Sequence, residues 1–475
     1  MPPSVVKSQA SVRYSSATGK WIILAAVLGS GIAFLDSTVV NVAIPTIRED
    51  LNTGLAGVQW TIDAYLLTLS ALLLTGGSLG DLYGRRRMFV FGLIGFAATS
   101  TLCAIAPNIA VLNISRALQG TAAALLVPGS LAMISSSFHP ADRGRAIGAW
   151  SGLAGVTTAF GPFLGGFLID AVSWRMIFLI NLPLAAIAVW IAVKHVPETR
   201  DEEGAQRPDV PGAFAAAVAL GGILYGFIEG PVVGWDSPSI YGALVLGVVA
   251  SVAFVMIEAL KKEPMLHLSL FRSRQFSGAN AATLLIYGAL SGAMFLVVIQ
   301  FQTVLGYSPL EAGASLVPVT LLLLVMSSRT GALATRIGPR LPMTVGPLVA
   351  AVGLGLMAAI EPGTRYLTTA LPGIVVFGVG LGITVAPLTT AVLAAAPSRY
   401  AGVASGVNNA VARTAGALAV AILPIAGGIA GEAGATAERF NSGFARTMLI
   451  AAALCAGGGF LSFIFIRKPD EQAES

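Results

Sequence analysis

Long apolar runs dominate this chain of 475 residues, and short polar segments separate them. Most of the runs hold eighteen or more predominantly apolar residues, which is long enough for a helix to cross a bilayer. They show no alternation of period two, so the pattern favours helices over the strands of a barrel. It predicts about fourteen spanning helices, over residues 20–45, 57–79, 88–106, 109–134, 145–169, 174–194, 210–230, 239–259, 276–303, 310–335, 342–360, 368–396, 401–430 and 444–466.

The basic residues are distributed unevenly among the polar segments, and this distribution predicts an orientation. With the N-terminus inside, 20 of the 28 Lys and Arg residues fall in cytoplasmic segments, five fall outside and three lie at membrane depth. Cytoplasmic loops are enriched in Lys and Arg, so both termini are expected in the cytoplasm. The net charge of +5 is then a topology signal, and no nucleic-acid partner is expected.

An internal repeat indicates that the chain has two similar halves. The segment GSLGDLYGRR at 77–86 aligns with GALATRIGPR at 331–340, an offset of 254 residues. A charged segment with two prolines, at 194–209, follows the sixth predicted helix. The sequence therefore predicts a six-helix bundle at 1–194, then a linker with two inserted helices and a loop at 195–275. A second six-helix bundle is predicted at 276–475.

Several motifs, taken in order, resemble those of one transporter family. They include LDSTVVNVAIP at 35–45, GSLGDLYGRRRM at 77–88, RALQGTAAALLVPGS at 116–130 and GPFLGG at 161–166. Together they resemble the major facilitator superfamily, specifically its fourteen-span drug:proton antiporters. The resemblance implies an all-α membrane protein with the major facilitator fold, two six-helix bundles plus two inserted helices. It also implies a multi-pass protein of the bacterial cytoplasmic membrane.

The loop between the second and third helices carries an unusual concentration of charge. Its glycines allow a tight turn, and its arginines anchor that turn in the cytoplasm. A carboxylate at this helix end is also placed to pair across the interface of the two bundles in one state and to release in the other. The resemblance implies this gating role for Gly77, Asp81, Gly84, Arg85 and Arg86.

Three charged residues lie at membrane depth in the first half, where charge is expensive and usually functional. They are Asp36, Asp63 and Arg116. A permanent ion pair that orients helices is one interpretation. The other is a carboxylate that loads and releases a proton, since burial favours its neutral form and a nearby arginine its charged form. The resemblance favours Asp36 and Arg116 as the proton-coupling pair. Asp63 is the next candidate, and it is also a candidate for binding cations.

Other polar and aromatic residues within the predicted spans are candidates for lining a substrate cavity, although each could equally serve helix packing. These candidates are Asn41, Trp60, Asp63, Tyr65, Gln300, Gln302, Asn408, Asn409 and Arg413. The fifth-span segment GPFLGG puts small residues on one helix face and a proline in the span, which favours close packing. The resemblance implies that this antiporter motif, formed by Gly161, Pro162, Gly165 and Gly166, shapes the central seam.

The sequence lacks the phosphate-binding loop of ATP-driven pumps, and its three histidines lie in predicted loops. No enzymatic activity, cofactor or metal site is therefore expected, and the proton gradient is the expected energy source. The expected function is proton-coupled antiport of small lipophilic compounds, preferably cationic, by rocker-switch alternating access. The alternative is export of one endogenous metabolite or lipid, with incidental drug transport. We expect the protein to work as a monomer within the lipid bilayer.

Overall fold

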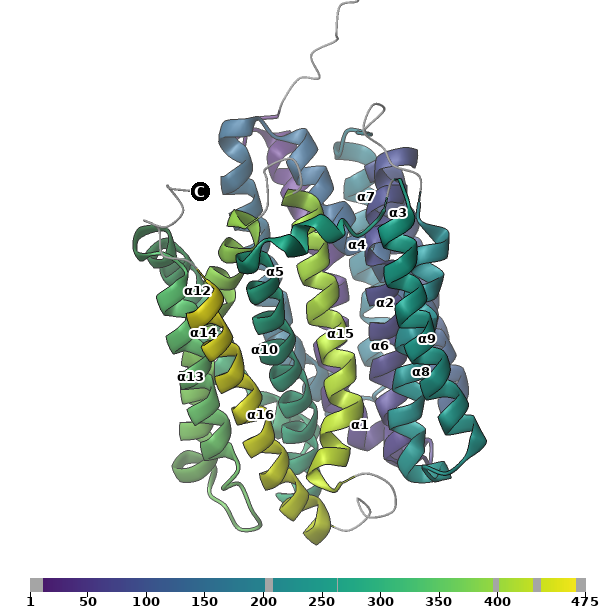
Figure 1. Ribbon diagram of the computed structural model, residues 1–475, viewed down its shortest axis with the longest axis vertical. Helices are drawn as coiled ribbons and strands as arrows, with labels where there is room; N and C mark the ends of the chain where they lie inside the picture. The colour runs from purple at the N-terminus through teal and green to yellow at the C-terminus, as the bar shows by residue number, and fades with distance from the viewer. Residues whose placement is uncertain (1–11, 201–207, 263, 396–400, 430–436, 467–475) are drawn as a thin grey trace, which may run out of the picture.

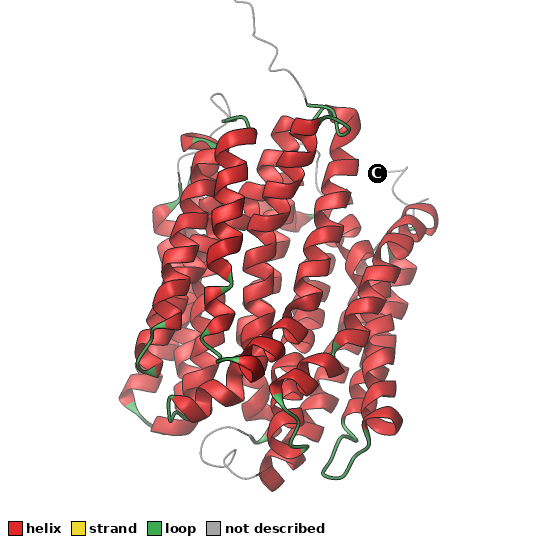
Figure 2. Cartoon of the chain, turned by 180° about the vertical axis from the view of Figure 1, so that it is seen from behind, coloured by secondary structure: helices red, strands yellow, loops and turns green. Residues whose placement is uncertain are grey.

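The computed structural model describes residues 12–200, 208–262, 264–395, 401–429 and 437–466, and these residues fold almost entirely into helices (Figures 1 and 2). The helices are α1 (Ala17–Asp50), α2 (Leu55–Tyr83), α3 (Arg85–Ala104), α4 (Ile109–Ser137), α5 (Pro140–Ala171), α6 (Met176–Leu179), α7 (Asn181–His195), α8 (Val210–Val233), α9 (Pro238–Leu260), η1 (Leu268–Arg272), α10 (Arg274–Ile299), η2 (Gln300–Val304), α11 (Pro309–Ser315), α12 (Val317–Ile337), α13 (Arg340–Met357), η3 (Tyr366–Ala370), α14 (Leu371–Ala394), α15 (Ala401–Gly427) and α16 (Ala437–Phe465).

Each predicted span overlaps a helix or a pair of consecutive helices. Within the described residues, thirteen helices are long and apolar enough to cross a membrane. A further apolar stretch, Phe160–Ala171, forms part of the 32-residue helix α5. The all-helical membrane fold predicted from the sequence is thus confirmed, whereas the count of fourteen spans stays a prediction.

The helices pack as two groups with a hairpin between them. Helices α1–α7 pack against one another, as do α10–α16, and we call these groups the first and second halves. The hairpin α8–α9 packs on α2 of the first half and on α15 of the second (Figure 1). The predicted division into two six-helix bundles and an insert, with boundaries at 194 and 275, stays a prediction.

Several of the predicted spans are not single continuous α-helices, and a proline accounts for one of the interruptions. The predicted span 310–335 divides into α11 and α12 at Leu316. Pro318 follows at the start of α12, where its missing N–H is tolerated. The predicted span 276–303 ends instead in the π-helical turn η2.

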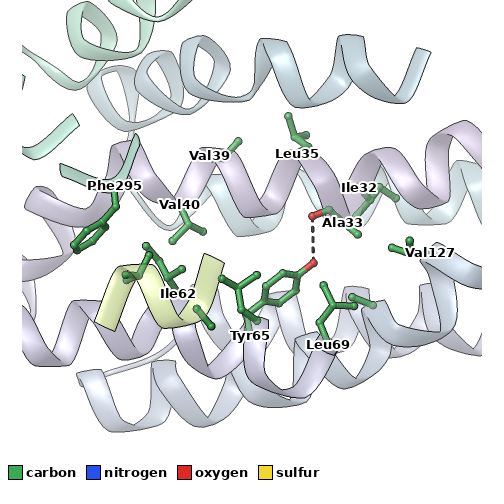
Figure 3. Packing of buried hydrophobic residues seen from close by; sticks show 14 of the residues in the cluster. Ile32, Ala33, Leu35, Val39, Val40, Ile62, Tyr65, Leu69, Val127 and Phe295 are labelled. Atoms are coloured by element: carbon green, nitrogen blue, oxygen red, sulfur yellow. Dashed lines mark hydrogen bonds between the residues drawn. The ribbon is translucent and has the colours of Figure 1, made fainter. Parts of the chain in front are cut away.

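Apolar side chains inside the bundle and on its outside have different surroundings. Inside the first half, Tyr65 of α2 packs among the side chains of α1 and donates its hydroxyl to the carbonyl of Ala33 at 3.2 Å (Figure 3). On the outside, α9 exposes Val245, Val248 and Val252. An apolar face of this kind suits contact with lipid chains.

The inserted hairpin is closed at its base by a salt bridge. Asp209 caps α8 by accepting a hydrogen bond from the Gly212 amide at 2.8 Å. It also accepts one from Nζ of Lys261, just after α9, at 2.8 Å. Burial raises the pKa of Asp209, but Lys261 and the Gly212 amide oppose this, and the pKa lies below its usual value of 3.8. The carboxylate thus stays charged and ties the two helix ends together.

The bundle has two distinct ends. Helix α1 begins and α16 ends at the same end, shown at the top of Figure 1, which we call the terminal end. The opposite end, which we call the far end, carries the turns after α1, α3, α5 and α13. Arg85, Lys261 and Arg340 all lie at the terminal end.

Candidate functional site

A polar network surrounds Asp36 inside the first half, where α1, α3, α4 and α7 meet. The carboxylate accepts hydrogen bonds from Nη1 of Arg116 and, at 3.0 Å, from Nε2 of Gln119. A third donor is Nδ2 of Asn181 at 3.2 Å. The amides of Gln119 and Asn181 also donate to the Ser100 hydroxyl, at 2.8 and 3.2 Å. All of these side chains are buried, and the ion pair has the additional hydrogen bonds that a buried pair requires.

Arg116 is held from several directions besides the carboxylate. Its Nε donates to the carbonyl of Thr61 in α2 at 2.9 Å, and its Nη1 donates to Oε1 of Gln119 at 2.6 Å. The guanidinium carbon lies 4.4 Å from the ring centroid of Tyr65, a cation–π contact. These contacts fix the arginine relative to α2 as well as to α1.

Asp63 of α2 has surroundings of a different kind. Its side chain is 0% exposed, and neither carboxyl oxygen has a hydrogen-bond partner. One turn earlier on the same helix face, Gln59 donates across to the carbonyl of Val420 in α15 at 2.8 Å. Leu66, three residues later, lies next to Gly416 of α15. Asp63 therefore lies at the seam between the two halves.

Trp60 lies on another face of α2, toward the inserted hairpin. Its Nε1 donates to Oε1 of Glu229 in α8 at 2.9 Å, and its ring centroid lies 6.5 Å from that of Tyr225 in α8. The residue therefore anchors the hairpin to the first half. The structure separates it from Asp63, which shares the helix face of Gln59 that meets α15, and from Tyr65, which packs on α1.

Three polar candidates lie toward the far end. Gln302 donates across the seam to the carbonyl of Val42 in α1 at 2.8 Å. Gln300 is buried in the second half and donates to the carbonyl of Ile360 at 2.9 Å and to Oδ1 of Asn441 at 2.6 Å. Asn41 donates to the carbonyl of Ser37 in its own helix at 3.4 Å. Only Gln302 among these three bridges the halves.

The candidates on α15 make contrasting contacts. Asn408 donates to Oδ1 of Asn280 at 3.2 Å and to the Thr283 hydroxyl of α10 at 2.7 Å. Asn409 donates to the carbonyl of Ser405 in its own helix at 3.3 Å. The guanidinium carbon of Arg413 lies 5.3 Å from the ring centroid of Phe34 in α1. Arg413 therefore reaches across the seam to the first half.

The charged loop between α2 and α3 forms its described ion pairs within the first half and with the linker. Arg85 pairs with Asp81 at 2.7 Å, and Nε of Arg86 lies 3.6 Å from Oε2 of Glu198 in the linker. Glu198 also accepts from the backbone amides of Arg86 and Arg87, which begin α3. Gly84 turns the chain with a φ of +106°.

Gly77, the remaining candidate of this loop, lies in van der Waals contact with α4. A Cβ added there would be 3.7 Å from Pro128. The structure thus shows this loop held to its own half. The predicted pairing across the two halves stays a prediction.

The glycines of the fifth-span motif lie where α5 meets α1 and α11. A Cβ on Gly161 or Gly165 would lie 2.0 Å from Oγ1 of Thr38 or 2.9 Å from Cγ1 of Val39. A Cβ on Gly166 would lie 2.4 Å from the carbonyl oxygen of Pro309, at the start of α11. These positions leave no room for a Cβ, so glycine allows α5 to approach both α1 and α11 closely.

The structure adds partners to this packing that the sequence analysis did not single out. A Cβ on Gly313 of α11 would lie 2.1 Å from the carbonyl oxygen of Pro162. Beyond it, the backbone amide of Leu310 donates to Oδ2 of Asp170 at 3.0 Å. Together with the bonds of Gln59 and Gln302, this contact joins the two halves at the far end.

A bundle of membrane-crossing helices in two packed halves, with charged groups buried within it, is the structure of an integral membrane protein in which buried charge has a function. The model of the Major Facilitator Superfamily matches residues 26–421, and the chain belongs to that superfamily. It is therefore a transporter and not an enzyme.

Relatives and solved structures agree with this membership. The chain is 34% identical over 403 residues to the tetracenomycin C resistance and export protein of Streptomyces glaucescens, covering 85% of this chain and 75% of the relative. It is 35% identical over 402 residues to the multidrug resistance protein Stp of Mycobacterium tuberculosis, covering 84% and 74%. A bacterial homologue of the human lysosomal transporter Spinster shares the fold, with a TM-score of 0.68, 17% identity and coverage of 96% and 99%.

Proposed function

We propose that this protein is a proton-coupled antiporter that exports small lipophilic compounds, including drugs. The names of its relatives support export, because they describe resistance to tetracenomycin C, puromycin and methylenomycin A. The clustering of Arg85, Lys261 and Arg340 at the terminal end supports a cytoplasmic location for that end. The protein would then lie in the bacterial cytoplasmic membrane, with both termini inside, and work as a monomer.

The observation that carries the proposal is the contrast between the two buried acids. Asp36 has an arginine and two amides as hydrogen-bond donors, all within the first half. Asp63 has no donor at either oxygen and no exposure to solvent. A buried carboxyl group without a partner is stable only in its neutral form. We therefore assign the exchanged proton to Asp63 and a positioning role to the paired Asp36.

Asp36, Arg116 and Asp63 were the residues expected to couple protons, and this contrast gives them different roles. Asp63 lies at the seam, so a change in the packing of α2 against α15 changes its access to water. The fixed pair of Asp36 and Arg116 holds α1 and α4 in register beside it. Asp63 then exchanges its proton for substrate, and the Asp36 network positions the helix pair.

Asp63 also accounts for a preference for cationic substrates. Once Asp63 has lost its proton, its carboxylate is an uncompensated negative charge at low dielectric, where attraction to a cation is strong. A lipophilic monovalent cation can neutralise it as the proton did. Competition between proton and cation for one carboxylate gives exchange of one for the other, which is antiport.

Transport into proteoliposomes under an imposed pH gradient tests this function. Purified protein is reconstituted, and the uptake of a fluorescent lipophilic cation is followed with the lumen acidic. We expect uphill uptake that stops when an ionophore dissipates the gradient. Asp63→Asn should abolish it, whereas Asp50→Asn, which alters an acid paired with Arg175 at the far end, is the control and should retain it. Uptake that ignores the gradient would contradict proton coupling.

A further inference from the structure

Arg413 is a charged residue of the seam that proton coupling through Asp63 leaves without a role. It lies twelve residues into the 27-residue helix α15, about 18 Å along the helix axis at 1.5 Å per residue. That is deep within a hydrocarbon layer about 30 Å thick. A charge at such depth is costly, and it persists where it pairs with another group or with a ligand.

No carboxylate of the described residues lies within ion-pair distance of Arg413. The two acids of the first-half spans do not serve it, because Asp36 pairs with Arg116 and Asp63 has no partner. Asn409, one turn earlier on the same helix, bonds within α15. The guanidinium therefore has no counter-ion among the described residues.

Aromatic residues of both halves lie at the level of the guanidinium. Phe34 of α1 lies 5.3 Å from its central carbon. Tyr287 of α10 adjoins Gly288, where an added Cβ would lie 3.5 Å from the carbonyl oxygen of Ala415, two residues after Arg413. Arg413, Phe34 and Tyr287 are all partly exposed, in contrast to the fully buried Arg116. The site is thus an accessible cation at membrane depth with flat apolar surfaces beside it.

This chemistry fits the acidic group of an aromatic compound. A guanidinium presents a planar fork of donors that matches a carboxylate or a comparable anion, and it binds such groups in two parallel hydrogen bonds. Rings next to the fork can stack on the apolar body of the same ligand. A lipophilic cation would be repelled from this point by the charge of Arg413.

We propose that Arg413, with Phe34 and Tyr287, forms an anion subsite separate from Asp63, so that the exporter also takes aromatic compounds bearing an acidic group. The proposal rests on the proposed function only in assuming that the seam admits substrate. It assigns cationic substrates to Asp63 of the first half and acidic substrates to Arg413 of the second half.

Binding to purified protein in nanodiscs tests the proposal with two matched probes. One is an anthracene sulfonate and the other is an anthracenyl trimethylammonium, whose charges do not change with pH. Affinities are measured by fluorescence for the wild type, Arg413→Gln, Arg413→Lys and Asp63→Asn. We expect Arg413→Gln to weaken the sulfonate at least tenfold while leaving the ammonium within twofold. Arg413→Lys, which retains a cation but not the planar fork, should weaken the sulfonate less than Arg413→Gln does, and Asp63→Asn should weaken only the ammonium.

Other results would contradict either the anion subsite or the proposed proton coupling. A wild type that binds the ammonium but not the sulfonate would overturn the anion subsite and leave the proposed cation export intact. Equal loss of both probes in a well-folded Arg413→Gln protein would make Arg413 a structural residue and also overturn the subsite. If the sulfonate binds through Arg413 while cation uptake ignores the pH gradient, the subsite stands and proton coupling fails.

Discussion

Replacement by asparagine should lower the stability of the protein strongly at Asp36 and very little at Asp63. Asp36→Asn leaves the buried Arg116 without its counter-charge, and breaking a buried pair in this way costs about 3–5 kcal/mol. Asp63→Asn replaces a neutral acid by a neutral amide of similar size, so stability should change little. Thermal unfolding of both variants in detergent measures this contrast. A large loss on Asp63→Asn would show that this residue is charged and paired in the folded protein.

At the residue scale the sequence singled out the charges at membrane depth but not the side chains that contact them. Asp36 and Arg116 stand out because charge at membrane depth is rare. Gln119 and Asn181, which complete the network, are ordinary polar residues whose role depends on four helices meeting. Glu198 caps α3 from a linker more than a hundred residues away. Contacts of this kind are tertiary, and no local spacing indicates them.

At the element scale, α5 and α11 form a close backbone contact between the two halves. Gly313→Ala would put a Cβ 2.1 Å from the backbone oxygen of Pro162, so the helices must move apart. Overpacking of this kind costs about 1–3 kcal/mol. Because the contact lies at the far end, the variant should favour states in which that end is open. Gly355→Ala in α13, where a Cβ would meet nothing within 4 Å, is the matched control.

Spin labels at two exposed residues of the far end measure this effect. Cysteines replacing Glu49 and Glu361 place one label on each half, and the native Cys103 and Cys455 are buried. We expect a longer mean distance between the labels in Gly313→Ala than in the wild type or in Gly355→Ala. Identical distance distributions in all three proteins would mean that this contact does not control the far end.

Element positions were largely predictable because apolar length and turn residues determine them. The interruption at Leu316 and the division of the sixth span into α6 and α7 were not predicted, since hydropathy stays high through both. The contact of the hairpin α8–α9 with both α2 and α15 was not predicted either. It depends on Trp60 reaching Glu229 across a large sequence separation.

At the scale of the whole molecule, the described hydrogen bonds between the halves gather at the far end. Gln59, Gln302 and Asp170 each take part in one of them. If the terminal end faces the cytoplasm, these contacts close this state to the outside. On the proposed mechanism, Asp63 took up its proton from the outside before the far end closed. Alternating access then requires these three contacts to break when the terminal end closes.

The most direct test of the central claim is proton release on substrate binding. A lipophilic cation is added to purified protein in weakly buffered detergent solution, and the pH change is recorded over a range of starting pH for the wild type, Asp63→Asn and Asp36→Asn. The account predicts release by the wild type, none by Asp63→Asn, and release by any Asp36→Asn protein that remains folded. Release by Asp63→Asn with an unchanged pH profile, together with its loss in folded Asp36→Asn, would contradict the account and assign the exchanged proton to Asp36.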